Sequence, residues 1–391
     1  MLLFRADTAH RHPRLVAAAG SLMETAMLDP ADPVASARTL GLRGCTTFLD
    51  SELDTCDLLL AGLGLPGAAS AERPWDKLVQ RKAFGSVAGA VDAPGDLRAA
   101  VATLGLPGLL KPRRGVAGAG IGLLREQDDV DAEYASREQW ARLTYERFIP
   151  NGSHPSGVPW LADYVSVDTV SVADARHHVA VVDKLPLHIC QGITETGDVY
   201  PSRLQAADRA RVLAATDRAL AALGVRDRLT HTELRVTPQD VEVIEVNGRL
   251  GGEVHRLVRQ LGGPDLAACA LTVALGRAPE VAAGPGEGYR CTLYVPFPVR
   301  TGLVRSDVRT AELVGIPGVV SVDEIARQGD PRAAIEGLTC RLLLAADSAE
   351  GLDKIVSGAV SAVAALFAAD DVSNGHWVTT MLSAIERGGS A

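Results

Sequence analysis

The chain lacks several features that mark common classes of protein. Its net charge is −9, so it has no excess of positive charge with which to neutralise a nucleic-acid backbone. Its longest run of small apolar residues, over 356–369, is shorter than the ~20 residues that span a bilayer. Residues 1–14 contain too short an apolar run for a signal peptide. We therefore expect a cytoplasmic protein that binds neither nucleic acid nor membrane.

Paired cysteines are also absent from the sequence. The six cysteines are scattered, with no two in a CxxC arrangement, which predicts buried free thiols in a reducing compartment. With 391 residues, of which 47% are hydrophobic and 22% charged, the chain can bury a large core. Its length predicts about two or three domains.

Lysine is scarce, because only five of the 39 basic residues are lysine and the rest are arginine. In a sequence that strongly prefers arginine, a retained lysine can mark a place where a compact point charge is needed, such as a phosphate site. The five are Lys77, Lys82, Lys111, Lys184 and Lys354.

The spacing of apolar residues predicts a mixed α/β chain. A small α/β segment covers 1–70, with a strand expected over 45–50 between two helices. A late core helix should carry Val356, Val360, Val363 and Phe367 on one stripe. The other expected elements are a helix over 72–84, strands at 108–112 and 121–126, a helix over 128–140, a strand at 142–149, an antiparallel pair at 161–174 and 176–188, a long helix within 195–225, a hairpin over 231–247, and strands at 290–298, 318–325 and 339–347.

A glycine-rich loop, GVAGAGIG, joins the strands at 108–112 and 121–126. It is not a dinucleotide fingerprint, because that motif leads into a helix, and no P-loop motif occurs in the chain. The backbone N–H groups of a loop with Gly118 and Gly120 could close over phosphates while Lys111 supplies charge. An ordinary glycine turn is the alternative interpretation.

The segment HTELRVTPQDVEVIEVNGRLGGE predicts a hairpin that turns at 237–240. Folding about this turn sets Glu233 opposite Glu245, although like charges directly across a ladder destabilise it. Strand parity places Glu245, Asn247 and Arg249 on one face. The opposite face is expected to carry Glu242, Ile244 and Val246.

A divalent cation between the two carboxylates would turn their repulsion into attraction. Glu233, Glu245 and Asn247 offer hard oxygen ligands of the kind that Mg²⁺ prefers. Arg249, on the same face, could bind a transferring phosphoryl group. A solvent-facing polar strand pair is the alternative, and it accounts well for Glu242.

Polar residues after the hairpin suggest a further anion site. A helix is expected to begin near Gly252, and helix N-termini favour anions. Gly251, Gly252, His255 and Arg256 could therefore bind a substrate carboxylate, with simple surface polarity as the alternative. His231 is expected to buttress the hairpin.

The hairpin resembles the metal-binding signature of ATP-grasp enzymes, and especially of carboxylate–amine ligases such as the bacterial L-amino acid ligases. The resemblance continues along the chain in family order. WDKLVQRKAF is similar to the segment before the lid, LPGLLKPRRGVAGAGIG to the lid strand and phosphate loop, YERFIPNG to the adenine-binding linker, and ETGDVYPS to the acidic loop beside the substrate.

This resemblance implies the fold class and its division. We expect an α/β protein with the ATP-grasp fold, in which a flexible lid closes over ATP. The expected parts are a small N-terminal α/β domain over 1–75, a lid subdomain with its lead-in helix over 76–147, a core with the metal site over 148–275, and a C-terminal α/β extension over 276–391. The extension offers surface for a homodimer.

The resemblance also implies a role for each matching residue. Lys77 and Lys111 would be the two nucleotide lysines, and Lys184 would reach the terminal phosphate. The ribose would bind Asp163, and the amine of an amino acid substrate would bind Glu195. The adenine linker would be formed by Glu146, Phe148 and Ile149, and relatives commonly carry histidine where this chain has Asp198.

The implied function is ATP-dependent ligation of a carboxylate to an amine through an acyl phosphate, with release of ADP and phosphate. The cofactors would be ATP and Mg²⁺, with Mn²⁺ as an alternative metal, and the partners would be small-molecule acids and amines. Other functions stay open: a carboxylating or phosphorylating ATP-grasp enzyme, or a nucleotide-binding regulatory subunit without turnover.

Overall fold

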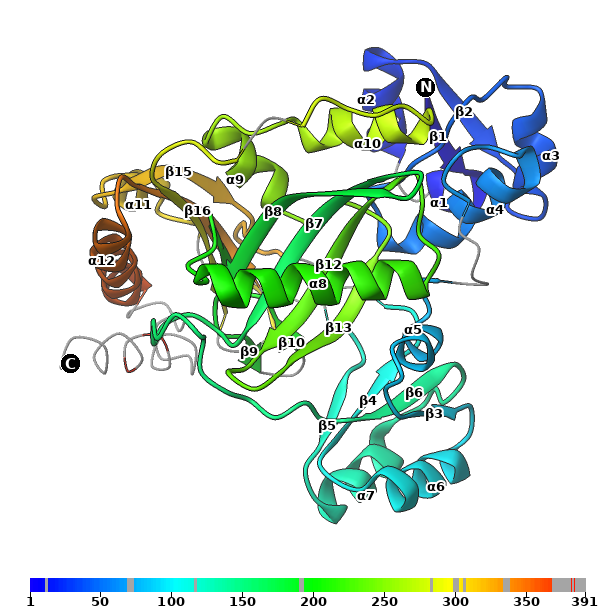
Figure 1. Ribbon diagram of the computed structural model, residues 1–391. Helices are drawn as coiled ribbons and strands as arrows, with labels where there is room; N and C mark the ends of the chain where they lie inside the picture. The colour runs from blue at the N-terminus through cyan, green and yellow to red at the C-terminus, as the bar shows by residue number, and fades with distance from the viewer. Residues whose placement is uncertain are drawn as a thin grey trace.

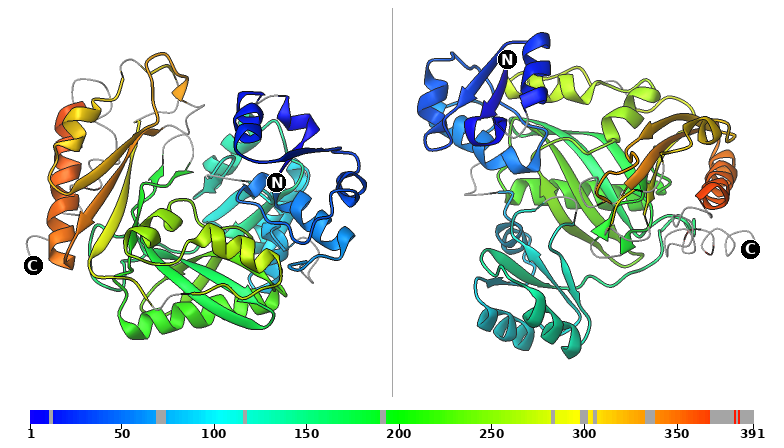
Figure 2. Two further views of the ribbon diagram at one scale, coloured as in Figure 1. Left: turned by 90° about the horizontal axis from the view of Figure 1, so that it is seen from above. Right: turned by 180° about the vertical axis from the view of Figure 1, so that it is seen from behind.

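The computed structural model describes most of the chain and shows three regions around one large sheet (Figure 1). An N-terminal domain and a small four-stranded sheet flank the hairpin end of the large sheet, and the C-terminal strands extend its other end (Figure 2). The described residues are 1–10, 13–68, 74–115, 118–189, 193–281, 284–297, 302–304, 307–332, 338–367, 381 and 383.

The N-terminal domain is a pair of parallel strands covered by short helices. Leu28, Ala37 and Leu59 form its small core. The strand expected over 45–50 is wrong: this stretch pairs with no strand and leads into a 3-10 helix, so its β propensity finds no partner ladder. The elements are β1 (Leu2–Arg5), α1 (Ala6–Ala9), α2 (Pro13–Leu22), β2 (Thr25–Leu28), α3 (Pro33–Arg38), η1 (Asp50–Glu52) and α4 (Leu53–Leu63).

The lid is an antiparallel sheet in the order β3-β6-β4-β5, with two helices against it (Figure 1). Leu97 from the first helix packs with Leu110 and Tyr145 from the central strands, all fully buried. A lead-in helix connects the N-terminal domain to this sheet. The elements are α5 (Lys77–Ala83), β3 (Ala88–Val91), α6 (Pro94–Leu104), β4 (Gly108–Pro112), β5 (Gly122–Leu124), α7 (Gln127–Ser136) and β6 (Leu143–Arg147).

The eight-stranded sheet has the order β13-β12-β7-β8-β11-β14-β16-β15. Its neighbouring strands are antiparallel throughout. Strands before and after residue 276, the expected domain boundary, therefore share one sheet. They are β7 (Tyr164–Val172), β8 (Ala175–Lys184), β11 (Gly197–Tyr200), β12 (Arg228–Val236), β13 (Val241–Asn247), β14 (Tyr289–Pro296), β15 (Val319–Glu324) and β16 (Leu338–Ala346), and a separate pair is formed by β9 (His188–Ile189) and β10 (Ile193–Thr194).

Helices cover the two faces of the hairpin half of this sheet. Helix α8 (Ala206–Ala222) packs Val212 and Leu220 against inward-facing valines of the strands. On the opposite face lie α9 (Val254–Gln260) and α10 (Leu266–Ala274), which pack through Leu257 and Val273 (Figure 1).

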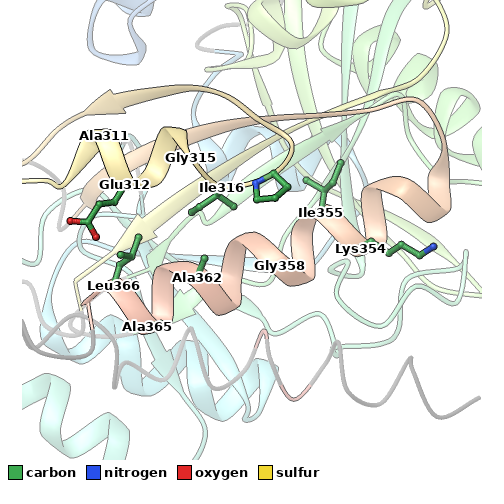
Figure 3. Close-up of a pocket in the computed structure, with 11 residues that line it drawn as sticks. Ala311, Glu312, Gly315, Ile316, Lys354, Ile355, Gly358, Ala362, Ala365 and Leu366 are labelled. Atoms are coloured by element: carbon green, nitrogen blue, oxygen red, sulfur yellow. The ribbon is translucent and has the colours of Figure 1, made fainter.

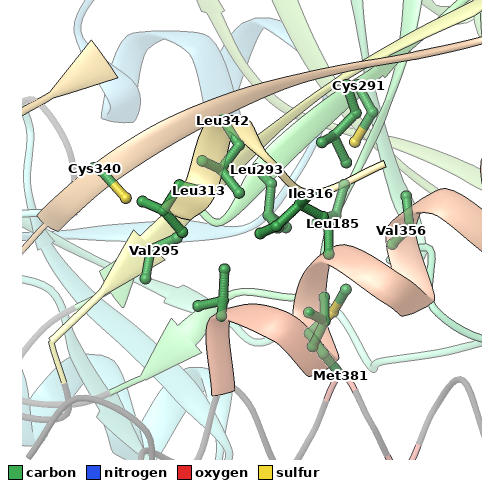
Figure 4. Packing of buried hydrophobic residues seen from close by; sticks show 14 of the residues in the cluster. Leu185, Cys291, Leu293, Val295, Leu313, Ile316, Cys340, Leu342, Val356 and Met381 are labelled. Atoms are coloured by element: carbon green, nitrogen blue, oxygen red, sulfur yellow. The ribbon is translucent and has the colours of Figure 1, made fainter. Parts of the chain in front are cut away.

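The C-terminal strands have their own apolar core. Helix α12 (Ala349–Phe367) lies along β14 and β16 and buries Val356, Val360 and Val363, as the stripe predicts, while the side chain of Phe367 lies outside the described residues. These valines meet strand residues such as Leu293 and Leu342 (Figure 4). Burial of one such side chain stabilises the fold by about 1.5–3 kcal/mol. No helix in the described ranges is both long and apolar enough to cross a membrane.

Candidate active site

Helix α5 seals the outer edge of β13, which is an edge strand of the large sheet. The Gln80 amide bonds the backbone of Val246 twice: it donates to the carbonyl at 2.6 Å and accepts from the N–H at 3.0 Å. Arg81 donates to the carbonyls of Val243 and Ile244 at 2.8 and 2.9 Å. Side chains of α5 thus replace a neighbouring strand and satisfy backbone groups that need partners.

The same helix presents Lys77 to the polar face of the hairpin. The carboxylate of Asp76 caps α5 by accepting from the N–H groups of Leu78 and Val79. Lys77 Nζ lies 2.7 Å from Glu245 Oε2. Burial lowers the pKa of the Lys77 ammonium, but Glu245 together with Glu233 and Asp50 outweighs burial, and the net shift is upward. Lys77 is therefore a fixed positive charge beside the hairpin.

Lys111 comes from β4 of the lid and is buried in a three-residue charge cluster. Its Nζ lies 2.5 Å from Glu146 Oε1, and Arg81 Nε donates to the same carboxylate at 2.7 Å. The three side chains are each 4% exposed. Burial lowers the pKa of the Lys111 ammonium, and Glu146 offsets only part of this effect. Glu146 thus joins a lid strand to α5.

Glu233 and Glu245 are partners in the β12–β13 ladder, as predicted for a turn at 237–240. The ladder is not regular, however. Glu233 pairs with Glu245 while the next residue, Leu234, pairs with Val243, which leaves Ile244 as an extra residue. This β-bulge changes the direction of the side chains along β13.

The bulge explains one error in the expected strand faces. Val243 and Val246 lie on the two sides of Ile244, and both pack in the apolar cluster beneath α8. The expectation that Glu242, Ile244 and Val246 share a face by strict alternation is therefore wrong. The extra residue lets the apolar residues before and after it point into the same core.

The polar face of the hairpin carries a set of oxygen ligands. Asn247 Nδ2 donates to Glu245 Oε1 at 2.9 Å, and Glu245 faces Glu233 across the ladder. Two carboxylates and a carboxamide suit a hard cation such as Mg²⁺. Among the described residues, no three His, Cys, Asp or Glu side chains converge to hold a metal by themselves. A cation here needs phosphate oxygens or water as further ligands.

His231 supports this face from the adjacent position of β12. Its Nδ1 lies 3.0 Å from Asp168 Oδ2, and its Nε2 lies 3.6 Å from Glu233 Oε1. Burial lowers the pKa of His231, but the Asp168 carboxylate outweighs burial and raises the pKa to about 9. The charged ring orders Glu233, as a buttressing residue should.

Arg249 follows the hairpin and is held by the N-terminal domain. Its Nε and Nη2 donate to the two oxygens of Asp50 at 2.8 and 2.7 Å, and its Nη1 donates to the Leu250 carbonyl at 2.9 Å. Bidentate pairing fixes the plane of the guanidinium. Asp50, on η1, therefore sets the direction in which Arg249 faces the two glutamates.

Lys184 anchors a second charge cluster at the end of β8. It is the ladder partner of Asp198, and its Nζ lies 2.8 Å from Asp198 Oδ1 and 3.6 Å from Glu195 Oε2. The Tyr294 hydroxyl donates to Asp198 Oδ2 at 2.9 Å. Burial lowers the pKa of the Lys184 ammonium, but Asp198 and then Glu195 outweigh it and raise the pKa well above its usual range. Glu195 is the exposed member of the cluster.

The two clusters form one site. The charge of Glu233 raises the pKa of Lys77, Lys184 and Arg249, so all three cations lie within its electrostatic reach. Lys111 is joined to them because Glu245 acts on its pKa as well. These residues come from α5, the lid, β8, the hairpin and the segment after it, and the fold brings them together.

The expected nucleotide linker runs from the end of β6 toward β7. Phe148 N–H donates to the Pro107 carbonyl at 3.1 Å, and Phe148 and Ile149 are half-buried. Asp163, expected at the ribose, accepts from Arg235 Nη1 at 2.6 Å and from the Gly152 N–H. Asp163 is thus tied to the hairpin and the linker rather than free.

The glycine loop lies against Ile193 of β10, and the two arginines that precede the loop are held by ion pairs. Gly118 has a φ of +67°, and an added Cβ would lie 2.7 Å from the Ile193 carbonyl oxygen. Gly120 also has positive φ, at +72°. Arg113 pairs with Asp76 at 2.8 Å, and Arg114 pairs with Asp54 of α4. The loop is therefore connected both to α5 and to the N-terminal domain.

The four residues expected to bind a substrate carboxylate are placed differently from one another. The N–H of Gly251 donates to Asp168 Oδ1 at 2.9 Å, while Gly252 is exposed. His255 Nδ1 bonds the Gly252 carbonyl at 3.0 Å. Arg256 donates to Ser321 at 2.6 Å and pairs with Asp323 of β15. Helix α9 begins at Val254, so it starts two residues later than expected.

An apolar cavity lies away from this site. It has a volume of about 700 Å³ and lies between α11 (Thr310–Val314) and α12 (Figure 3). Its two charged lining residues, Glu312 and Lys354, lie at opposite ends of the groove (Figure 3). No converging polar set marks this cavity as a reaction site among its lining residues, so the chemistry is assigned to the charged cluster.

Sequence reasoning missed several residues that organise the site. Gln80 and Arg81 lie three and four positions after Lys77, where side chains share a helix face, so their spacing was a usable signal. Asp50 and Asp168 gave no such signal, because they reach the site from other elements. Asp198 was noted as a departure but not as the partner of Lys184.

Comparison with known proteins identifies the architecture. No protein-family profile matches the chain. The structure matches L-amino acid ligase from Bacillus licheniformis over 84% of this chain and 84% of that one, with a TM-score of 0.67 and 19% identity. The chain has the ATP-grasp fold. Other ATP-grasp structures that it matches were solved with ADP or ATP bound.

Sequence relatives point to the same family. Carnosine synthase 1 of Mus musculus is 28% identical over 282 residues, which are 65% of this chain and 33% of that protein. Alanine–anticapsin ligase of Bacillus subtilis is 28% identical over 249 residues, which are 58% of this chain and 52% of that protein. The match thus spans between a third and about half of the length of these curated relatives. The predicted resemblance to ATP-grasp ligases is confirmed.

Proposed function

We propose that the protein joins a carboxylate to an amine through an acyl phosphate, using ATP and releasing ADP and phosphate. The convergence of Glu233, Glu245 and Arg249 with Lys77 and Lys111 is the observation that carries this proposal. The ligase names of the relatives support it and favour amino acids or related small molecules as substrates.

The nucleotide would lie between the lid sheet and the hairpin. Lys77 and Lys111 come from these two sides and supply positive charge for phosphates. Gly118 and Gly120 allow the loop backbone to approach the phosphates closely. The half-buried Phe148 would pack on the adenine, with Glu146, Ile149 and Asp163 completing the linker and ribose contacts.

The oxygen ligands at the hairpin fit Mg²⁺, or Mn²⁺ in its place. Glu233, Glu245 and Asn247 would hold the ion together with phosphate oxygens. The ion would supply positive charge between the carboxylates and the phosphates, which removes the repulsion within the ladder. His231 would keep Glu233 oriented toward it.

The residues of the chain would then stabilise charge as it moves. A carboxylate oxygen of the acid attacks the γ-phosphorus of ATP, and ADP leaves. Arg249, fixed by Asp50, faces the charge that develops on the transferring phosphoryl group. Lys184, whose pKa the charge of Glu233 also raises, would reach the terminal phosphate.

An amine then attacks the carbonyl carbon of the acyl phosphate, and phosphate leaves. The exposed carboxylate of Glu195 would hold the amine of the substrate. The exposed Gly252, with Gly251, His255 and Arg256 beside it, would hold a substrate carboxylate. Closure of the lid would exclude water, which otherwise hydrolyses an acyl phosphate.

The test is ADP release with Mg·ATP across a matrix of amino acids, singly and in pairs. Release that requires one acid and one amine, with a product of the mass of their amide, supports ligation. Release with a single acid and no amide product would replace ligation by phosphorylation. Binding of ATP without release under every pair would contradict an enzymatic role for the tested substrates.

Replacement of Glu245 by glutamine tests the site itself. Loss of one metal-binding carboxylate and of the Lys77 pair should slow ADP release by about 100-fold or more. Glu242→Gln is the matched control, because Glu242 lies on the same strand but is partly exposed and outside the ligand set. Equal rates in the Glu245 and Glu242 variants would refute the assignment of the ligands.

A further inference from the structure

Two cysteines of the N-terminal domain lie side by side near the candidate site. The Sγ atoms of Cys45 and Cys56 are 3.8 Å apart, and both residues are free thiols. Cys45 is half-buried in the segment before η1, whereas Cys56 is 3% exposed on α4. The sulfurs are thus in contact, and a disulfide between them would need a separation of about 2.05 Å.

Cys56 lies in a charged environment. Arg228 Nη2 donates to Cys56 Sγ at 3.3 Å, and Arg228 Nη1 pairs with Asp57 at 2.5 Å. Trp75 fixes this arrangement, because its Nε1 donates to Asp57 at 2.7 Å and its ring lies 5.0 Å from the Arg228 guanidinium. The hydrogen bond with Cys45 and then the charge of Arg228 lower the pKa of Cys56. A thiolate is the reactive form of cysteine in thiol–disulfide exchange.

The other described cysteines differ from this pair. Cys269, Cys291 and Cys340 are buried free thiols. Burial raises the pKa of each, to about 12 for Cys340. Buried neutral thiols react slowly with oxidants. The hydrogen bond with Cys56 and then burial raise the pKa of Cys45, so the thiolate of Cys56 is the group that reacts first.

The ten residues between the two cysteines reach the candidate site at two points. Asp50 accepts from Nε and Nη2 of Arg249, and Asp54 pairs with Arg114, which directly precedes the glycine loop. A bond between Cys45 and Cys56 would close this segment into a loop and restrict its motion. The segment therefore connects the thiol pair to the residues proposed to bind phosphate.

We propose that Cys45 and Cys56 are an oxidisable dithiol site whose closure to a disulfide restrains residues 46–55 and slows turnover at the candidate site. The oxidant is a low-molecular-weight disulfide. The Cys56 thiolate attacks one of its sulfurs and displaces one thiolate. Cys45, after losing its proton, attacks the Cys56 sulfur of the mixed disulfide and displaces the second thiolate. Two cysteine thiols and one small disulfide thus become one protein disulfide and two small thiols.

The chemistry is tested with glutathione disulfide on the full chain. Differential alkylation and peptide mass spectrometry should show a Cys45–Cys56 cross-link that dithiothreitol reverses. Cys45→Ser should instead retain glutathione on Cys56, because the resolving thiol is missing. Cys269→Ser is the matched control and should form the cross-link like the wild type. Absence of the cross-link, or equal modification of Cys269, would overturn the proposal.

The coupling to the site is tested by two readouts, of which only the first rests on the proposed function. Oxidised wild-type protein should release ADP about tenfold more slowly, within the usual range of coupling between sites. Oxidised Cys45→Ser should show no such slowing. Hydrogen exchange should slow in residues 46–55 on oxidation, whether or not ADP is released. Cross-linked protein with unchanged exchange in this segment would overturn the coupling, whereas absent turnover with slowed exchange would refute only the ligase function.

Discussion

Replacement of Glu146 by glutamine would remove the charge that joins the lid to the rest of the site. Glu146 lies between Arg81 and Lys111, and all three side chains are almost fully buried. Glutamine has nearly the same shape, so packing is kept while the negative charge is lost. The variant leaves two buried cations without their shared carboxylate.

The size of the loss in stability depends on which partners Arg81 and Lys111 keep in the variant. Breaking a buried ion pair by removing one partner costs about 3–5 kcal/mol. Arg81 keeps the carbonyls of Val243 and Ile244, and Lys111 can shed its proton, so both relieve part of the cost. We therefore expect the free energy of unfolding to fall by about 3 kcal/mol, at the lower end of that range. Urea denaturation at neutral pH measures this loss.

The dependence on pH gives a second readout. Burial already lowers the pKa of Lys111 in the wild type, and loss of Glu146 lowers it further. At pH values between the pKa of Lys111 in the folded variant and its pKa of about 10.4 in the unfolded chain, the unfolded chain binds more protons than the folded one. The free energy of unfolding of the variant therefore rises with pH over this range. The deficit of the variant should therefore shrink as the pH increases toward 10.4.

Asp174→Asn is the control for this experiment. Asp174 pairs with Arg226 at 3.3 Å, but both side chains are exposed, so the loss should stay below about 1 kcal/mol. A loss below about 1 kcal/mol for Glu146→Gln as well would refute the reasoning, because it would mean that the buried cluster contributes no more than a surface pair.

Two further substitutions test the geometry of the site. Asp50→Asn removes the charge that orients Arg249 and should lower kcat for ADP release about tenfold, with little change in KM for ATP. Glu52→Gln, on the same 3-10 helix, is the control and should leave kcat and KM unchanged. A change in KM alone would argue against orientation of Arg249. Gly118→Ala places a Cβ on a residue with a φ of +67° and within 2.7 Å of a backbone carbonyl oxygen. Calorimetry should therefore show about tenfold weaker ATP binding by this variant. Gly115→Ala is the control, because its Cβ would meet only ordinary contacts, and it should bind ATP with wild-type affinity. Equal affinities for these two variants would show that the loop does not close on the nucleotide.

The hairpin shows how far sequence can predict such a site. The turn at 237–240 and period-two alternation were enough to place Glu233 opposite Glu245, because both rules act over a few residues. The same rules failed at Ile244. The local sequence pattern does not predict the bulge. The bulge allows both Val243 and Val246 to bury their side chains beneath α8.

Contacts between distant elements could not be predicted in the same way. Asp50 meets Arg249 across 199 positions of sequence, and the pair depends on how the N-terminal domain packs. Lys184 was expected at a phosphate, and its pairing with Asp198 requires the register of β8 and β11. The roles given to the nucleotide and substrate residues stay predictions, because they depend on bound molecules.

Helix α5 both places Lys77 at the candidate site and covers the outer edge of the large sheet. Gln80 and Arg81 occupy hydrogen-bonding groups on the outer edge of β13, which would otherwise be open to a strand from another molecule. A variant that releases α5 would lose Lys77 from the site and at the same time uncover an aggregation-prone edge. The contacts that cover this sheet edge are therefore also the contacts that hold Lys77 beside Glu245.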